Sequence, residues 1–330
     1  MKNILLTGGA GYIGSHTAVE LLNRGANVII ADNYSNSSPD ILERIKQITG
    51  RDVQCHEMDM TDETAVEKLF TNNQIDAAVH FAGLKAVGES VRLPLKYYRN
   101  NIDSTLVLLE AMARHNVNNL IFSSSATVYG TPEKLPVAED AKVGPCANPY
   151  GRTKLMIEEI IRDYTVSNPD FSAVLLRYFN PVGAHQSGLI GENPRDIPNN
   201  LMPYISQVAW GKLSELNVYG NDYPTKDGTG VRDYIHVVDL AKGHIAALDY
   251  CDKNTGVEVF NLGTGVGYSV LDLVNTFERV NGISVPYKFA ERRPGDIAAY
   301  YSDPQKAEKI LGWRAQLGLE DMCRDTWNRR

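Results

Sequence analysis

The amino-acid sequence predicts an α/β fold in which a doubly wound parallel sheet carries helices on both faces. Over the first 180 residues, short apolar runs alternate with longer stretches of helical periodicity. The expected strands are Asn3–Leu6, Asn27–Ala31, Val53–Met58, Ala77–Phe81, Leu120–Ser123 and Ala173–Tyr178. The expected helices are Ile13–Arg24, Ile41–Ile48, Glu63–Asn72, Tyr97–His115 and Tyr150–Asn168. Because a helix of sufficient length lies between each expected strand and the next, right-handed crossovers and parallel pairing are favoured.

The second half of the chain has a different pattern. Seven glycines and prolines fall between Pro181 and Pro203, and such a density predicts a long loop of the kind that usually serves a function. Further helices are expected near Met202–Trp210, Val237–Tyr250 and Val270–Val280. We therefore expect one domain at 1–180 and a smaller mixed α/β substrate-binding domain at 181–330, some segments of which return to the first.

Composition and charge argue against several classes of protein. The net charge of −7 disfavours an extended polyanion such as nucleic acid as partner. No apolar stretch approaches the roughly 20 residues of a membrane span, and no signal-peptide core follows the first residues. The cysteines lack metal-ligand spacing, so we expect no metal and interpret them as reduced thiols of a cytoplasmic protein. They are Cys55, Cys146, Cys251 and Cys323.

A glycine-rich segment, TGGAGYIG at residues 7–14, lies between the first expected strand and the first expected helix. Gly8, Gly11 and Gly14 allow a tight turn, close approach of the backbone to a pyrophosphate, and close packing of helix on strand. The helix N-terminus then presents free N–H groups to the phosphates. The same triplet is compatible with an ordinary turn before a helix, so a dinucleotide site needs further support.

Residues after the next three strands supply that support. Asp32 follows the second strand, 18 residues after Gly14. A carboxylate there accepts hydrogen bonds from the adenosine ribose and repels a 2′-phosphate, which favours NAD over NADP. Asp32 is also compatible with a simple turn residue, and the other candidates with ordinary strand ends. These other candidate cofactor contacts are Asp59, Met60, Phe81, Ala82 and Gly83.

A tyrosine and a lysine four residues apart form the candidate catalytic pair. Tyr150 and Lys154 share one face of a predicted helix. A neighbouring ammonium favours the phenolate, whose ordinary pKa of about 10 is too high for a base near neutral pH. Taken alone, the pair is more typical of an ordinary helix surface. However, Ser125 ends a buried-type strand, and the carboxyl ends of such strands line ligand crevices.

Together these residues resemble the extended short-chain dehydrogenase/reductase family, and most closely its UDP-galactose 4-epimerases. The resemblance covers essentially the whole chain. The matching stretches are TGGAGYIGSH at 7–16, HFAGLKAVGES at 80–90, SSSATVYG at 123–130, NPYGRTK at 148–154, RYFNPVGAH at 177–185, IPNNLMPYI at 197–205 and GTGVRDYIHV at 228–237.

The resemblance implies a role for each matching residue. The catalytic residues are Ser125, Tyr150 and Lys154. The NAD site comprises the three glycines with Tyr12, Ile13, Asp32, Asn33, Asp59, Met60, Phe81, Ala82, Gly83, Lys85, Asn100, Tyr150, Lys154 and Phe179. The UDP-sugar contacts are Lys85, Ser125, Thr127, Tyr150, Asn180, Asn200, Leu201, Asn217, Val218, Tyr219, Arg232, Arg293, Asp296 and Tyr300. Arg232 and Arg293 also suit a diphosphate by their chemistry, although solvated surface arginines are the alternative.

The resemblance further implies the reaction and the assembly. The expected activity is the interconversion of UDP-galactose and UDP-glucose, an NAD-dependent isomerisation of galactose metabolism. NAD is expected to stay bound throughout the cycle. The expected assembly is a homodimer joined through the helices Tyr97–His115 and Tyr150–Asn168.

The sequence is compared with three alternative functions. The first is a sugar-nucleotide 4,6-dehydratase or a decarboxylase of the same fold; a dehydratase needs an extra acid and base beside the serine, where this chain has Ala126 and Thr127. A catalytically inactive NAD-sensing protein would typically lack Tyr150 or Lys154, and both are present. Members of the family that accept N-acetylated sugars carry a smaller residue at the position of Tyr300, so Tyr300 predicts a hexose-only enzyme.

Overall fold

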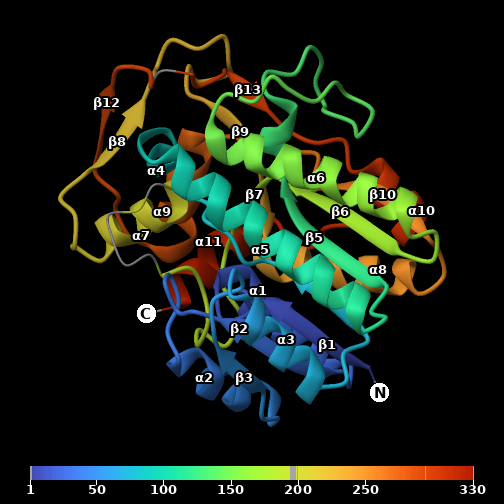
Figure 1. Ribbon diagram of the computed structural model, residues 1–330. Coiled ribbons are helices and arrows are strands. Elements are labelled where there is room, and N and C mark those ends of the chain that lie inside the picture. The colour runs from blue at the N-terminus through green and yellow to red at the C-terminus, as the bar shows by residue number, and fades with distance from the viewer. Residues whose placement is uncertain (1, 194–197, 199, 294, 330) are drawn as a thin grey trace.

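A seven-stranded parallel sheet forms the centre of the molecule (Figure 1). The computed structural model describes residues 2–193, 198, 200–293 and 295–329. The strand order is β10-β6-β5-β4-β1-β2-β3, and every neighbouring pair is parallel. The strands are β1 (Asn3–Thr7), β2 (Asn27–Asp32), β3 (Gln54–Glu57), β4 (Ala77–His80), β5 (Asn119–Ser125), β6 (Ser172–Tyr178) and β10 (Gly256–Leu262). The fold class predicted from the sequence is confirmed.

Helices cover both faces of this sheet because side chains alternate along each strand. Leu6 and Ile30 are buried against one layer of helices, whereas Leu5 and Phe122 are buried against the other. The first layer is α1 (Tyr12–Asn23), α2 (Asp40–Thr49), α8 (Val237–Cys251) and α10 (Gln305–Leu311), and the second is α3 (Glu63–Asn72), α5 (Pro94–Arg114) and α6 (Pro149–Ser167). In Figure 1, α5 and α6 lie in front of the sheet and α8 lies behind it.

The helices expected in the first half are all present, with ends displaced by at most three residues. The largest displacement is at α5, which starts at Pro94 rather than Tyr97. Proline is well tolerated in the first helical turn because its missing N–H has no partner there. A six-residue helix, α4 (Val87–Arg92), precedes it and is too short to show periodicity. Within the described residues, no helix has the length and apolar content needed to cross a bilayer.

The chain after residue 180 builds two small sheets beside the strand ends. In one, β9 (Val231–His236) pairs with β7, β11 and β13, and in the other β8 pairs with β12. Their bounds are β7 (Asn180–Val182), β8 (Leu216–Tyr219), β11 (Gly267–Ser269), β12 (Tyr287–Ala290) and β13 (Ala299–Tyr300). The expected helices are present as α7 (Leu201–Ala209), α8 and α9 (Val270–Asn281), whereas α10 and α11 (Leu319–Asn328) are additional. Strand β10 and helix α8 return to the large sheet.

A buried ion pair fastens α6 to the sheet. Glu158 and Arg177 are both almost inaccessible to solvent, and their side chains meet twice, at 3.0 Å and 2.6 Å. The Ser124 hydroxyl donates to the same carboxylate at 2.5 Å. Arg177 also lies over the ring of Tyr129. The pair therefore joins α6 to both β5 and β6.

We predict that Arg177→Met destabilises the protein by about 3–5 kcal/mol, because it leaves the Glu158 carboxylate buried without a counter-charge. The double variant Arg177→Met with Glu158→Leu should recover most of this loss, since no uncompensated charge remains. Urea unfolding of the three proteins measures both effects. A double variant no more stable than the single one would contradict the assignment of the loss to charge burial.

Candidate active site

The carboxyl ends of the parallel strands bring predicted site residues to one edge of the sheet. Gly8 follows β1, Asp32 ends β2, Phe81 follows β4, Ser125 ends β5 and Phe179 follows β6. Because every strand of this sheet runs in the same direction, these positions lie at the same edge, where ligands of doubly wound proteins bind.

The turn between β1 and α1 forms a cradle that requires glycine. Gly8 has a φ of 68°, and a methyl group there would lie 2.8 Å from the backbone nitrogen of Ala82. A methyl group on Gly14 would lie 2.6 Å from the Gly8 carbonyl oxygen. Helix α1 begins at Tyr12, and no side chain caps its N-terminus at Gly11. An uncapped N-terminus beneath a close-packed glycine turn fits the pyrophosphate of a dinucleotide.

Asp32 orders the backbone beside this cradle. One carboxylate oxygen accepts from Ala10 N at 3.0 Å, and the other accepts from Tyr34 N at 2.9 Å and from the Ser37 hydroxyl at 2.8 Å. The Asp32 carboxylate thus orders the backbone around it, and its contact with a ribose remains a prediction. Neighbouring Asn33 donates to the Asp59 carboxylate at 3.1 Å.

A buried polar chain beneath the cradle was not predicted from the sequence. Ala82 N donates to the Thr7 hydroxyl, which contacts His80 Nδ1 at 2.6 Å, and His80 Nε2 contacts the Thr105 hydroxyl at 3.1 Å. Thr105 donates its own proton to Asn101 O. His80 Nε2 therefore carries the proton and Nδ1 accepts. Burial, with the nearby Lys154 charge, lowers the pKa of His80 to about 3 and keeps it neutral.

These hydrogen bonds continue through Asn101 to helix α6, which carries Tyr150 and Lys154. Asn101 exchanges two hydrogen bonds with the backbone of Leu84 and donates to the Thr153 hydroxyl at 3.1 Å. Thr153 in turn donates to Tyr150 O at 2.8 Å. The turn after β4, helix α5 and the start of α6 are thereby held together. In the sequence, this network is indicated only by polar residues at positions where the helix and strand patterns predict burial, and Thr7, His80 and Asn101 are examples.

Tyr150, Lys154 and Ser125 lie together at the end of β5. Lys154 Nζ donates to Ser123 O at 2.6 Å and lies 6.0 Å from the centre of the Tyr150 ring. Burial raises the pKa of Tyr150, and a hydrogen bond with Ser125 opposes that shift. Burial lowers the pKa of Lys154 to about 8, with the Glu158 charge opposing. The three groups predicted to be catalytic are thus in one cluster that can move a proton.

The two arginines that are predicted to bind a diphosphate come from the chain after residue 180, Arg232 from β9 and Arg293 from the segment between β12 and β13. Arg293 donates to Asp296 at 2.9 Å and lies 5.0 Å from the centre of the Tyr219 ring. Arg232 is 3.8 Å from the same carboxylate. In strand register, Tyr300 is paired with Arg232. The structure therefore places these predicted contacts beside one another.

Tyr300 is held close to the catalytic serine. Its hydroxyl donates to Ala126 O at 2.5 Å, and its ring stacks on Phe179 with centroids 5.3 Å apart. Thr127 donates to the Ser125 hydroxyl at 3.0 Å. The end of β5 thus touches the catalytic residues and the residue predicted to limit sugar size.

Other predicted contacts occupy the rim or the core. Lys85 and Asn200 both reach Glu192, at 3.4 Å and 3.1 Å. Met60 and Val218 are buried in hydrophobic cores, so only their backbones remain for a ligand. The exposed or partly exposed positions are Ile13, Asn100, Asn180, Leu201 and Asn217. Ile197 and Asn199, inside one matching stretch, lie outside the described residues.

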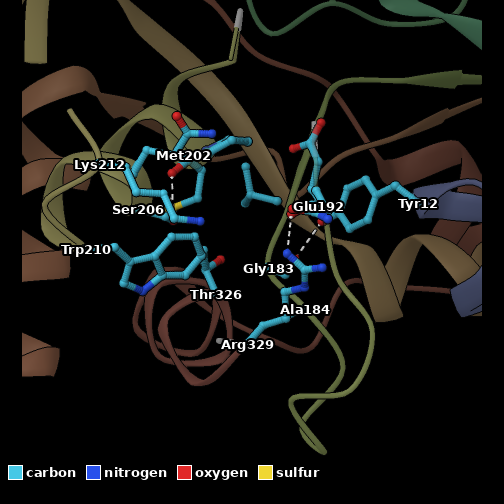
Figure 2. Close-up of a pocket in the computed structure, with 14 residues that line it drawn as sticks. Tyr12, Gly183, Ala184, Glu192, Met202, Ser206, Trp210, Lys212, Thr326 and Arg329 are labelled. Carbon is cyan, nitrogen blue, oxygen red and sulfur yellow. Dashed lines mark hydrogen bonds between the residues drawn. The ribbon is translucent and has the colours of Figure 1, made fainter. Parts of the chain in front are cut away.

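A separate pocket lies between the loop at 183–193, α7 and the end of α11. Figure 2 shows Tyr12 and Glu192 on one side of it and Trp210 on the other. Arg329 donates to Glu192 O at 3.2 Å, and the Tyr12 hydroxyl donates to Gly183 O at 2.7 Å. Among its described lining residues, Tyr12 is the only predicted cofactor or substrate contact, so the pocket borders the site without containing it.

Comparisons with known proteins agree with this geometry. A family model described as GDP-mannose 4,6 dehydratase matches residues 5–326. The UDP-glucose 4-epimerase of Bacillus subtilis is 60% identical over 98% of this chain and 95% of its own length. The human UDP-glucose 4-epimerase is 56% identical over 99% of this chain and 95% of its own length. The chain belongs to the UDP-glucose 4-epimerase family.

Solved structures of this epimerase family have the same fold. The Bifidobacterium longum epimerase, solved with NAD⁺ and UDP, gives a TM-score of 0.96 at 57% identity and covers 99% of this chain and 98% of its own. The Stenotrophomonas maltophila epimerase, with bound NAD and formylated UDP-arabinopyranose, gives 0.97 at 50% identity over 100% and 98%. The resemblance stated from the sequence is confirmed. Within the described residues, no group of three or more His, Cys, Asp or Glu side chains is arranged to hold a metal ion.

We predict that Lys154 lowers stability at neutral pH and does so less as pH rises. Its folded pKa of about 8 lies below the ordinary 10.5, so the penalty is complete below pH 8 and disappears toward pH 10.5. The change is on the order of 3 kcal/mol. In urea unfolding of the cofactor-free proteins, the free energy of unfolding of the wild type should rise relative to that of Lys154→Met between pH 7 and about pH 10. A constant difference would contradict the shifted pKa.

Proposed function

We propose that this protein interconverts UDP-galactose and UDP-glucose by reversible hydride transfer at sugar carbon 4, as an isomerase of galactose metabolism. The observation that carries the proposal is the cluster of Ser125, Tyr150 and Lys154 beside the glycine cradle, in a chain of the UDP-glucose 4-epimerase family. Bound NAD supplies the hydride acceptor for carbon 4 and the hydride donor for its return. No net oxidation results, so the cofactor needs no exchange with solution.

The chain's own residues move the proton. Tyr150 Oη accepts the proton of the sugar 4-hydroxyl and returns it when the hydride comes back. Ser125, which hydrogen-bonds Tyr150, also contacts the sugar hydroxyl and orients it. Burial raises the pKa of Tyr150 and its hydrogen bond with Ser125 opposes that shift. Lys154, with its Nζ 6.0 Å from the centre of the Tyr150 ring, provides a nearby positive charge that favours a phenolate. The Asn101–Thr153 bond holds the start of α6, so Tyr150 keeps its position through both half-reactions.

The nucleotide is held tightly while the sugar stays free to turn. Arg232 and Arg293 provide positive charges for the diphosphate. The Asp296 carboxylate lies close to both guanidinium groups and partly balances their charge. Inversion requires the 4-keto sugar to present its other face within the pocket, which a firm grip on UDP alone permits. Residues 1–180 hold the cofactor and residues 181–330 supply most of the UDP contacts in this proposal.

Elimination of water is disfavoured at this site. A 4,6-dehydratase needs an additional acid and base next to the serine, and the matched positions here are Ala126 and Thr127. Neither side chain exchanges protons near neutral pH. The match to a family model described as a dehydratase therefore reflects the shared fold rather than the reaction.

We also infer a homodimer and a cytoplasmic location. Apolar side chains are exposed on three neighbouring helices, Val91 on α4, Leu95 and Leu106 on α5, and Met156 on α6. A second copy packing on these helices would cover them from solvent. The four cysteines are free thiols, and three of them are buried, as is typical of a reducing compartment.

We predict that the wild-type protein converts UDP-galactose without added NAD, in an assay coupled to UDP-glucose oxidation. Tyr150→Phe removes the hydroxyl that accepts the proton and should lower kcat by about 10²- to 10⁴-fold while retaining NAD. Absorbance of the denatured protein measures the retained cofactor. Near-normal turnover of Tyr150→Phe would refute the assignment, and stoichiometric NADH released during turnover would refute the closed cycle.

We predict that the wild type does not turn over UDP-N-acetylglucosamine and that Tyr300→Cys does. The ring of Tyr300 fills space beside Phe179, and its replacement by cysteine opens room for an acetamido group. Turnover of UDP-galactose and UDP-N-acetylglucosamine by both proteins gives the comparison. Equal N-acetylhexosamine turnover before and after the substitution would remove Tyr300 as the determinant.

A further inference from the structure

Asp233 is a buried carboxylate that serves as a hub for five donors. One oxygen accepts from Thr264 N at 2.8 Å and from the Thr264 hydroxyl at 2.6 Å. The other accepts from Gly265 N at 3.1 Å, Ser302 N at 3.1 Å and the Ser302 hydroxyl at 2.5 Å. Its side chain has no exposed surface, and none of the ion pairs among the described residues includes it. Neutral donors alone therefore compensate its charge.

The donors come from two segments that meet β9 at its centre. Thr264 and Gly265 follow β10, the edge strand of the large sheet, whereas Ser302 follows β13. A side chain on Gly263 would collide with the Asp233 carboxylate and with the Ser302 hydroxyl, so this junction admits only glycine. The carboxylate therefore joins the large sheet to the small sheet that carries substrate contacts.

The hub is adjacent in sequence to two proposed substrate contacts. Asp233 directly follows Arg232, and side chains alternate along a strand, so the two side chains leave opposite faces of β9. Ser302 lies two residues after Tyr300, which pairs with Arg232 in strand register. Anchoring Ser302 thus fixes β13 against β9. The ring of Tyr300 and the guanidinium of Arg232 depend on that register for their relative position.

We propose that Asp233 is a positioning residue that sets the strength of UDP binding and the size limit for the sugar by locking β13 onto β9. The hydrogen-bond partners of its side chain, Thr264, Gly265 and Ser302, are neither proposed catalytic residues nor proposed substrate contacts. Its effect is therefore on binding and selectivity rather than on the proton and hydride steps. The inference rests on the proposed function and on the roles of Arg232 and Tyr300 within it.

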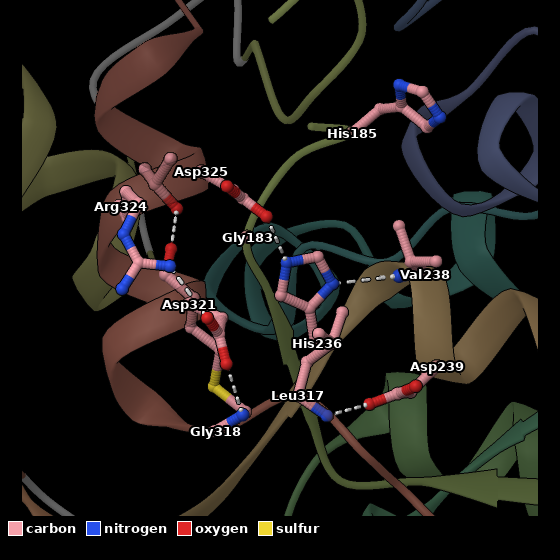
Figure 3. Close-up of polar contacts among 12 residues, drawn as sticks. Gly183, His185, His236, Val238, Asp239, Leu317, Gly318, Asp321, Arg324 and Asp325 are labelled. Carbon is pink, nitrogen blue, oxygen red and sulfur yellow. Dashed lines mark hydrogen bonds and ion pairs between the residues drawn. The ribbon is translucent and has the colours of Figure 1, made fainter. Parts of the chain in front are cut away.

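Asp233→Asn tests the proposal with almost no change in volume. Whichever way the amide turns, its NH₂ group faces at least one backbone N–H, of Thr264 or of Gly265 and Ser302. Asp239 offers a control for loss of a buried charge (Figure 3), because it is also fully buried and one of its oxygens accepts two backbone N–H groups, of Gln316 and Leu317. Its other oxygen has no hydrogen-bond partner among the described residues. Asp239→Asn removes the same charge from a carboxylate that is not bonded to β13.

For Asp233→Asn we expect the KM for UDP-galactose to rise about tenfold, with kcat changed by less than about threefold, as for a lost charge-assisted hydrogen bond that orders a binding strand. Turnover of UDP-N-acetylglucosamine, which we expect to be absent in the wild type, should appear. Asp239→Asn should leave the KM and the selectivity at wild-type values. Equal changes in the two variants would overturn the proposal, as would a fall in kcat with unchanged KM for Asp233→Asn.

Calorimetric titration with UDP gives a readout that does not depend on turnover. Asp233→Asn should bind UDP about tenfold more weakly than Asp239→Asn does. Unchanged UDP binding would overturn the positioning role even if epimerisation were confirmed, and absent epimerisation with weakened binding would overturn only the proposed reaction.

Where Asp233→Asn does not fold, Ser302→Ala removes one donor and leaves the carboxylate in place. It should shift KM, UDP affinity and selectivity in the same direction by a smaller factor, and wild-type values would overturn the proposal.

Discussion

The position of the catalytic helix depends on the buried ion pair between Glu158 and Arg177. The pair and the Ser124 hydroxyl join α6 to the ends of β5 and β6. The Asn101–Thr153 bond joins the start of the same helix to α5. Tyr150 and Lys154 lie on α6, and Ser125 ends β5, so their mutual geometry follows from these two attachments. A helix held by packing alone could slide along the sheet at smaller cost.

The same attachments explain how a lysine can be buried here. Burial opposes the charge of Lys154, whereas the carboxylate one turn later favours it. Glu158 is itself buried, and Arg177 supplies its counter-charge. Catalysis in our proposal needs an ammonium close to a phenol in a place that excludes water, which lowers stability. The ion pair therefore acts on both the position and the charge of the catalytic groups.

Much of this arrangement could be predicted from the sequence, because its signals are local. The strand–helix alternation predicts the parallel sheet, and parallel strands bring Gly8, Asp32 and Ser125 to one edge without further information. The short strands after residue 180 could not be predicted, since β7 and β11 have three residues each and β13 has two. Their pairing depends on partners far away in the chain. The Asp233 hub was missed for the same reason, as its donors lie 31 and 69 residues away.

In our proposal one residue, Ala126, influences both the type of reaction and the size of the sugar that is accepted. Its side chain is buried, so a carboxylate at this position would lose its hydration and lie against the core. Its carbonyl oxygen accepts the hydroxyl of Tyr300, which limits the sugar in our proposal. In our proposal residue 126 thus acts in two ways: its side chain offers no group that exchanges protons, and its backbone accepts the hydrogen bond that places Tyr300. In our proposal the end of β5 therefore both disfavours elimination and places the residue that limits the sugar.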